Sequence, residues 1–150
     1  MGLGRWVAIG IIVAIALSVI YFVDNPDEFN KLINPPPDVK FYQTSINKNE
    51  IKVGSITILT VNAINNEFEP VSVSLQINII GENAERHLSY PKSTELGTLE
   101  HNGSVFDQNK PIQILAKDVS GTSVPFEIEA NLIVDGKKSD TRIYPIKIFP

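Results

Sequence analysis

The feature that most constrains this chain is an unbroken apolar run near its start, WVAIGIIVAIALSVIYFV, from Trp6 to Val23. None of its eighteen residues is charged at neutral pH. As a helix the run rises about 27 Å, close to the ~30 Å hydrocarbon thickness of a bilayer. A core helix of a globular domain normally has a polar face, and this run has none. We therefore expect residues 1–23 to form a transmembrane anchor.

Aromatic residues lie at both ends of the run, with Trp6 at its start and Tyr21 and Phe22 near its end. Such rings favour the two water–lipid boundaries, so these residues are expected to lie at the membrane interfaces, with Arg5 beside Trp6. Arg5 precedes the run and acidic residues follow it. The positive-inside rule then predicts a single-pass protein of the cytoplasmic membrane, with its N-terminus inside and its C-terminal domain extracytoplasmic.

A cleaved export signal is the alternative interpretation of the same run. Ala14 and Ala16 have the small-x-small spacing of a cleavage site. Cleavage there would leave the strongly apolar segment LSVIYFV at the new terminus, and no small pair follows Val23. A retained anchor is favoured.

A stripe of small residues recurs every four positions within the run, at Gly10, Ala14 and Ser18. Positions four apart share one face of a helix, and small residues there let a second helix approach closely. The stripe predicts helix–helix packing with other subunits of a membrane complex.

The segment from 24 to 37 has the composition of a stalk. Pro26 is placed to open a short helical turn after Asn25, because proline is tolerated in the first turn of a helix. Pro35, Pro36 and Pro37 cannot continue that helix and favour an extended spacer. A folded domain is expected over residues 38–150.

From residue 38 onward the hydrophobic pattern has period two, which indicates strands with one buried face. The clearest examples are VSVSLQINI at 71–79 and FEIEANLIV at 126–134. In SITILTVNAI at 55–64 the alternation slips between Ile58 and Leu59, which predicts either a β-bulge or a central strand covered on both faces. Further strands are expected at 39–46, 111–117 and 141–149. The fold class is therefore all-β, an immunoglobulin-like antiparallel β-sandwich of about seven strands, preceded by one transmembrane α-helix.

The stretch PPPDVKFYQTSINKNEIKVGSITILTVNAINNEFEPVSVSLQINI resembles the opening of exported immunoglobulin-like modules of the CARDB type. The shared features are the proline-rich start, the Val53–Gly54 turn, an apolar strand ending at Asn62 or Asn65, and an alternating third strand. The resemblance covers residues 35–80 and returns at 123–149. It implies a surface-displayed binding module of prokaryotic, plausibly archaeal, type and assigns no catalytic residue.

Composition excludes several classes of function. The net charge of −4 argues against a nucleic-acid partner, because phosphates require a basic surface. The absence of cysteine excludes disulfides and thiolate metal sites. Only His87 and His101 offer imidazole ligands, so a metal site is conceivable only if carboxylates complete it. No catalytic residues, cofactor or small-molecule substrate are predicted.

The resulting hypothesis is a non-catalytic structural or accessory subunit of a membrane or cell-envelope complex. Its expected partners are the lipid bilayer and other membrane-complex subunits or a surface-layer protein. An archaellum-stator-like or surface-layer attachment protein is one alternative, and a metal-delivery accessory using His87 and His101 is another. Asn102 begins an Asn-Gly-Ser triplet, which is an acceptor for N-glycosylation on an exported loop.

Overall fold

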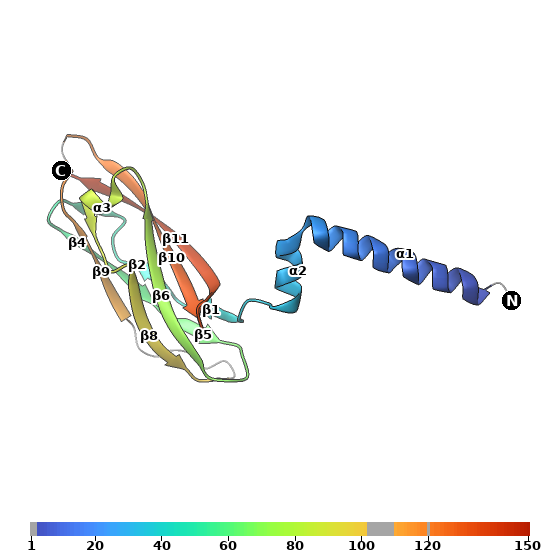
Figure 1. Ribbon diagram of the computed structural model, residues 1–150. Helices are drawn as coiled ribbons and strands as arrows, with labels where there is room; N and C mark the ends of the chain where they lie inside the picture. The colour runs from blue at the N-terminus through green and yellow to red at the C-terminus, as the bar shows by residue number, and fades with distance from the viewer. Residues whose placement is uncertain (1–2, 102–109, 120) are drawn as a thin grey trace. The chain divides into compact units, whose positions relative to one another are not determined.

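The computed structural model describes residues 3–101, 110–119 and 121–150, and for residues 3–10 and 110 it describes the backbone alone. The chain divides into two compact units, residues 1–36 and 37–150, and the division falls within the triple proline. Figure 1 shows the helices of the first unit and the strands of the second.

The first unit contains α1 (Leu3–Asp24) and α2 (Pro26–Ile33). Asn25 separates them: its backbone N–H donates to the Tyr21 carbonyl at 2.9 Å and its own carbonyl accepts from Glu28 at 3.1 Å. Pro26 opens α2, and Asp27 and Glu28 lie in its first turn, where negative charge opposes the helix dipole. Local sequence chemistry thus explains where α1 ends and α2 begins.

Within the described part of the chain, no helix is long and apolar enough to cross a membrane. This contradicts the anchor predicted for residues 1–23, the single-pass membrane localisation, and the fold description that placed a transmembrane helix before the strands.

The second unit is mostly β. Its strands are β1 (Val39–Phe41), β2 (Ser45–Ile46), β3 (Glu50–Lys52), β4 (Ile56–Val61), β5 (Ala63–Asn65), β6 (Val71–Ile80), β7 (Leu88–Ser89), β8 (Ser93–Leu99), β9 (Lys110–Ala116), β10 (Val124–Val134) and β11 (Lys137–Phe149), and one short helix, α3 (Ala84–His87), lies between β6 and β7.

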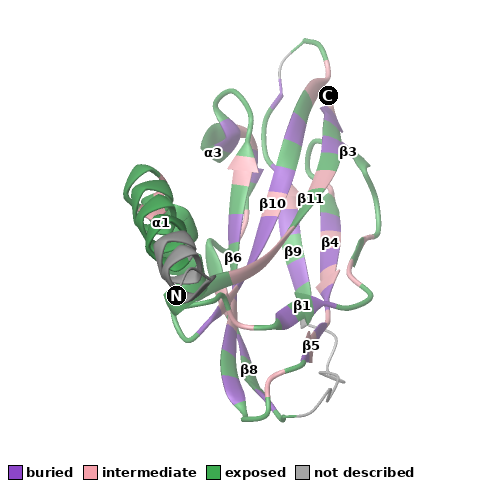
Figure 2. Ribbon diagram, turned by 90° about the vertical axis from the view of Figure 1, so that its right-hand side faces the viewer, coloured by how far each residue is buried: buried purple, intermediate pink, exposed green. Residues whose placement is uncertain are grey.

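The strands form two facing sheets and a small extra pair. The larger sheet has the order β3-β11-β10-β6-β8, the smaller has the order β2-β4-β9-β7, and β1 pairs with β5 beside them. All pairings are antiparallel except that of β3 with β11. One hydrophobic cluster, drawn from both sheets, fills the space between them. Figure 2 shows the buried residues alternating with exposed ones along β6 and β10.

Two irregularities differ from the pattern expected from the sequence. The bulge predicted between Ile58 and Leu59 is absent, because β4 pairs with β9 in unbroken register. The buried face of β4 includes the polar residue Thr57. Its side chain is fully buried, and its hydroxyl donates to the Lys48 carbonyl at 2.7 Å. The bulges lie elsewhere: Ser139 of β11 is the extra residue opposite Leu132 and Ile133, and Leu96 of β8 is the extra residue opposite Val73 and Ser74.

Candidate functional site

The described apolar side chains of α1 are largely exposed within the first unit. From Ile11 to Val23 its large apolar residues are exposed by 51% to 73%, apart from the half-buried Phe22. The Ser18 hydroxyl donates to the Ala14 carbonyl at 2.8 Å, so its polarity is satisfied within the helix. An exposed apolar surface of this kind marks a contact site for another molecule.

The structure describes the side chains of only some of the α1 residues predicted to lie at the membrane interfaces or on the small-residue stripe. The rings of Tyr21 and Phe22 contact each other edge to face, with centroids 5.5 Å apart. Phe22 also contacts Phe29 of α2 at 5.4 Å, and together with Val19 and Val23 they line an apolar pocket. The side chains of Arg5, Trp6 and Gly10 lie outside the described residues.

His87 lies at the end of α3, where its ring packs against Phe126 with centroids 5.9 Å apart. Its Nδ1 atom hydrogen-bonds the Asp118 backbone carbonyl. That contact occupies one ring nitrogen and fixes the ring orientation. His87 is thereby a packing residue that closes the corner between α3 and the segment after β9.

A shallow pocket of about 180 Å³ lies beside this corner and is lined by Glu85, Leu88, Ser89, Tyr90, Lys92 and Lys117. Lys92 and Glu85 form an ion pair of 2.5 Å across it. The hydrogen bond and the charge of Lys92 hold the pKa of the Glu85 carboxyl below its usual value. The charges of the pair are largely exposed, which gives them little energetic weight.

The two histidines are not brought together. α3 follows the end of β6, whereas His101 follows Leu99, which pairs with Val71 at the start of β6. The two ends of β6, which has ten residues, lie about 30 Å apart. Among the described residues, no group of three His, Asp or Glu side chains is placed to hold a metal ion. The predicted glycosylation site Asn102 lies outside the described residues.

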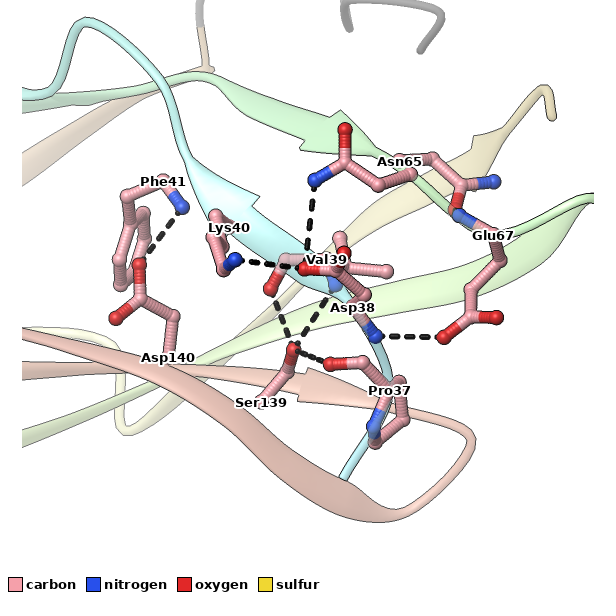
Figure 3. A network of polar contacts seen from close by, with 10 residues as sticks. Pro37, Asp38, Val39, Lys40, Phe41, Asn65, Glu67, Ser139 and Asp140 are labelled. Carbon is pink, nitrogen blue, oxygen red and sulfur yellow. Dashed lines mark hydrogen bonds and ion pairs between the residues drawn. The ribbon is translucent and has the colours of Figure 1, made fainter. Parts of the chain in front are cut away.

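A polar cluster holds the start of the second unit against β11 (Figure 3). Leu132 pairs with Asp140 and Ile133 with Lys138, so Ser139 is the extra residue of the β11 bulge. The Ser139 hydroxyl donates to the Pro37 carbonyl at 2.7 Å and accepts from the Val39 N–H at 3.3 Å.

The neighbouring Asp140 completes this attachment. Its carboxylate accepts from the Phe41 N–H at 2.9 Å, which fixes the other end of β1. β1 is thus held to β11 by side chains and to β5 by main-chain pairing.

A second polar cluster is organised by Asn65, which is fully buried at the end of β5. Its side-chain amide donates to the carbonyls of Glu69 at 2.9 Å and Glu100 at 3.0 Å, and the Leu99 carbonyl lies 3.3 Å away. Its side-chain oxygen accepts from the Glu67 N–H at 2.9 Å. One residue therefore shapes the β5–β6 loop, residues 66–70, and joins it to the end of β8.

Asp38 links the two clusters. Its backbone N–H donates to the Glu67 carboxylate at 2.6 Å, and its carbonyl accepts from the Asn66 N–H at 3.0 Å. Lys40 lies 2.8 Å from its carboxylate. Hydrogen bonds from Lys40 and then from Asn66 lower the pKa of the Asp38 carboxyl.

The outermost strands of the described sheets are short or interrupted. β2, β3 and β7 have only two or three residues each. The ladder of β8 is interrupted at Leu96, which has no partner in β6. Short strands and bulges discourage edge-to-edge pairing. β3 pairs with β11 only over residues 147–149, which leaves the rest of β11 without a described partner strand on that side.

Sequence reasoning missed both polar clusters. The sequence predicts Asn65 only as a possible strand end and predicts no role for Ser139. An asparagine that ends an apolar strand and precedes Asn-Glu is a recognisable signal for a side chain that caps a loop. No local signal marks Ser139, because its partners at Pro37 and Val39 are about a hundred positions away in the chain.

No protein-family model matches this chain, and no curated protein does. Solved structures of similar fold include the alkylpurine DNA glycosylase AlkC of Pseudomonas fluorescens, bound to DNA containing an abasic-site analogue. Its identity to this chain is 14% and the TM-score is 0.51, and the match covers 76% of this chain and 31% of that chain. They also include the α-2-macroglobulin of Escherichia coli from domain MG7 to its C-terminus, with 16% identity and a TM-score of 0.51 over 77% of this chain and 17% of that chain. This chain spans less than a third of either structure. At these identities the similarity shows the β fold alone.

Proposed function

We propose that this protein is a non-catalytic interaction subunit of a larger protein assembly. In this role α1 packs against partner subunits, and the β-sandwich presents a binding surface. The observation that carries the proposal is the uncovered apolar surface of α1. A helix that is apolar on every described face gains stability only when another protein removes that surface from water.

The β unit supports the same role. Its core is complete in itself, with residues such as Val39, Leu59 and Ile148 fully buried, so it requires no contribution from α1. The described pockets offer ion-paired and apolar side chains rather than a paired acid and base or a nucleophile with its base.

We also retain the CARDB type as a proposal for the sandwich. The Val53–Gly54 turn, on which the resemblance depends, is formed by Gly54 at a positive φ of 80°. The Gly54 N–H donates to the Ala116 carbonyl at 2.8 Å, which joins the turn to the end of β9.

The test is purification of the tagged full chain from its native source, followed by measurement of which proteins accompany it at fixed stoichiometry. Ala14→Leu is expected to loosen those partners, because it places a larger side chain on the small-residue stripe. Ala16→Leu is the matched control, since two residues correspond to about 200° around a helix and place it on the opposite face.

Co-purifying proteins that are lost with Ala14→Leu and kept with Ala16→Leu support the proposal. A full chain that behaves as a solitary monomer contradicts it. Measured turnover of a substrate by the purified chain contradicts its non-catalytic character.

A further inference from the structure

Phe68 has the most exposed large apolar side chain of the described residues, at 87%. It lies in the β5–β6 loop, between Glu67 and Glu69. Single apolar residues on a surface are common and need no explanation by themselves. What distinguishes Phe68 is the loop that carries it.

This loop is fixed on both sides of Phe68. Before it, the Glu67 N–H is bonded to the fully buried Asn65, and the Glu67 carboxylate accepts from the Asp38 N–H at 2.6 Å. After it, the Glu69 carbonyl accepts from the Asn65 amide at 2.9 Å. A loop held in this way presents its exposed ring with little backbone entropy left to lose on binding.

Acidic residues flank Phe68 in the chain, and others belong to the hydrogen-bonded cluster that holds its loop. Glu69 and Glu100 are exposed, and their backbones are held by the same Asn65 amide. Asp38 is also exposed and is paired with Lys40 at 2.8 Å. The chain as a whole has a net charge of −4. An aromatic anchor with an acidic surround complements an apolar pocket with a basic rim.

We propose that Phe68 is the anchor of a docking surface for a partner protein, and that it inserts into an apolar pocket rimmed by lysine or arginine. This inference rests on the proposed function and names the chemistry of one partner surface. Electrostatics disfavour an anionic lipid surface as the occupant, because the flanking carboxylates would be repelled by it. Insertion into lipid is accordingly one outcome that the experiment distinguishes.

The experiment places the photo-crosslinker p-benzoylphenylalanine at position 68 of the full chain in its native source. A matched protein carries the same crosslinker at Ile143, which is 55% exposed on β11. Glu129 of β10 pairs with Ile143 on one side and with Asn78 of β6 on the other. Asn78 is seven residues from Val71, where the β5–β6 loop joins β6. Ile143 therefore lies about 23 Å along the strand direction from that loop.

The expected result is a crosslink from position 68 to apolar residues of a partner protein, beside lysine or arginine, that position 143 does not make. Phe68→Ala is expected to weaken binding of that purified partner roughly 30-fold, whereas Phe68→Trp retains it. Glu69→Lys is expected to slow association and to reduce its dependence on salt. The midpoint of urea unfolding of Phe68→Ala should match that of the unchanged chain, which excludes a folding defect.

A crosslink to lipid, or to a polar or acidic protein surface, overturns the inference. So does the absence of any crosslink at 68 while the partners that depend on Ala14 still co-purify, and in that case the proposed function stands. If the full chain has no partners at all, both fail.

Discussion

At Asn65, a single carboxamide joins backbone groups from the β5–β6 loop and from the end of β8. The residue is fully buried, so water cannot replace the bonds it makes. A buried polar group that loses its partner costs more than the bond itself contributed. The shape of the loop therefore depends on this one side chain.

We expect Asn65→Ala to lower the free energy of unfolding by about 2–4 kcal/mol, because buried and partly buried backbone groups of the loop and of the end of β8 lose their partner. Asn66→Ala is the matched control, since Asn66 is the exposed neighbour and its side chain reaches only the Asp38 carboxylate at 3.4 Å. Urea unfolding of both variants measures the difference. Equal losses of stability would show that the buried cluster has no special role.

Among the elements, β10 and β6 share a polar ladder on the outer face of the larger sheet. The Asn78 amide donates to the Glu129 carboxylate at 3.1 Å, and Lys138 lies 3.5 Å from the same carboxylate. The hydrogen bond from Asn78, followed by those from Asn131 and the charge of Lys138, lowers the pKa of Glu129 below its ordinary 4.5.

A carboxyl whose pKa is lower in the folded state stabilises the fold above its unfolded pKa, and the contribution disappears as the pH falls through the folded value. We therefore expect Glu129→Gln to be less stable than the unchanged chain at pH 7, and the difference to shrink as the pH is lowered below 4.5. Urea unfolding across this pH range tests this. In an Asn78→Ala background the difference at pH 7 should shrink, and a difference independent of pH would contradict the assignment.

The strands show how far the sequence determines the elements. The alternation at 71–77 and 126–134 predicts most of the buried side chains: Val73, Leu75, Ile128 and Leu132 have no exposed surface, whereas Asn131, which the alternation places outward, is 3% exposed. On β4 the predicted bulge is absent, and the strand lies inside its sheet. The alternation slips there because Thr57 is polar yet buried, its hydroxyl satisfied by Asn47 and Lys48. A period-two pattern reports hydrophobicity, and it cannot show that a distant loop will satisfy a hydroxyl.

The same limit applies to the candidate surfaces. The sequence marked α1 as apolar, but hydrophobicity along a helix does not identify what covers it. Phe68 carried no sequence signal at all, because its exposure follows from the hydrogen bonds of Asn65 and Asp38 rather than from its neighbours in the chain. Long-range hydrogen bonding produced the features that periodicity could not predict.

At the scale of the whole molecule, the two units are expected to differ in what they contribute. The β unit has its own core, so residues 37–150 should unfold in one cooperative step with the same urea midpoint as the full chain. Circular dichroism measured during urea titration tests this. A lower midpoint for the fragment would show that the first unit stabilises the sandwich.

The attachment of Pro37 to Ser139 has a mechanical consequence. Ser139 and Phe149 are ten residues apart on β11, or about 33 Å, so Pro37 and Pro150 occupy opposite ends of the sandwich. A pulling force applied between these two points would run parallel to the strands and would load many ladder hydrogen bonds at once instead of opening them one at a time. A domain loaded in this way resists extension and could serve as a mechanical tether.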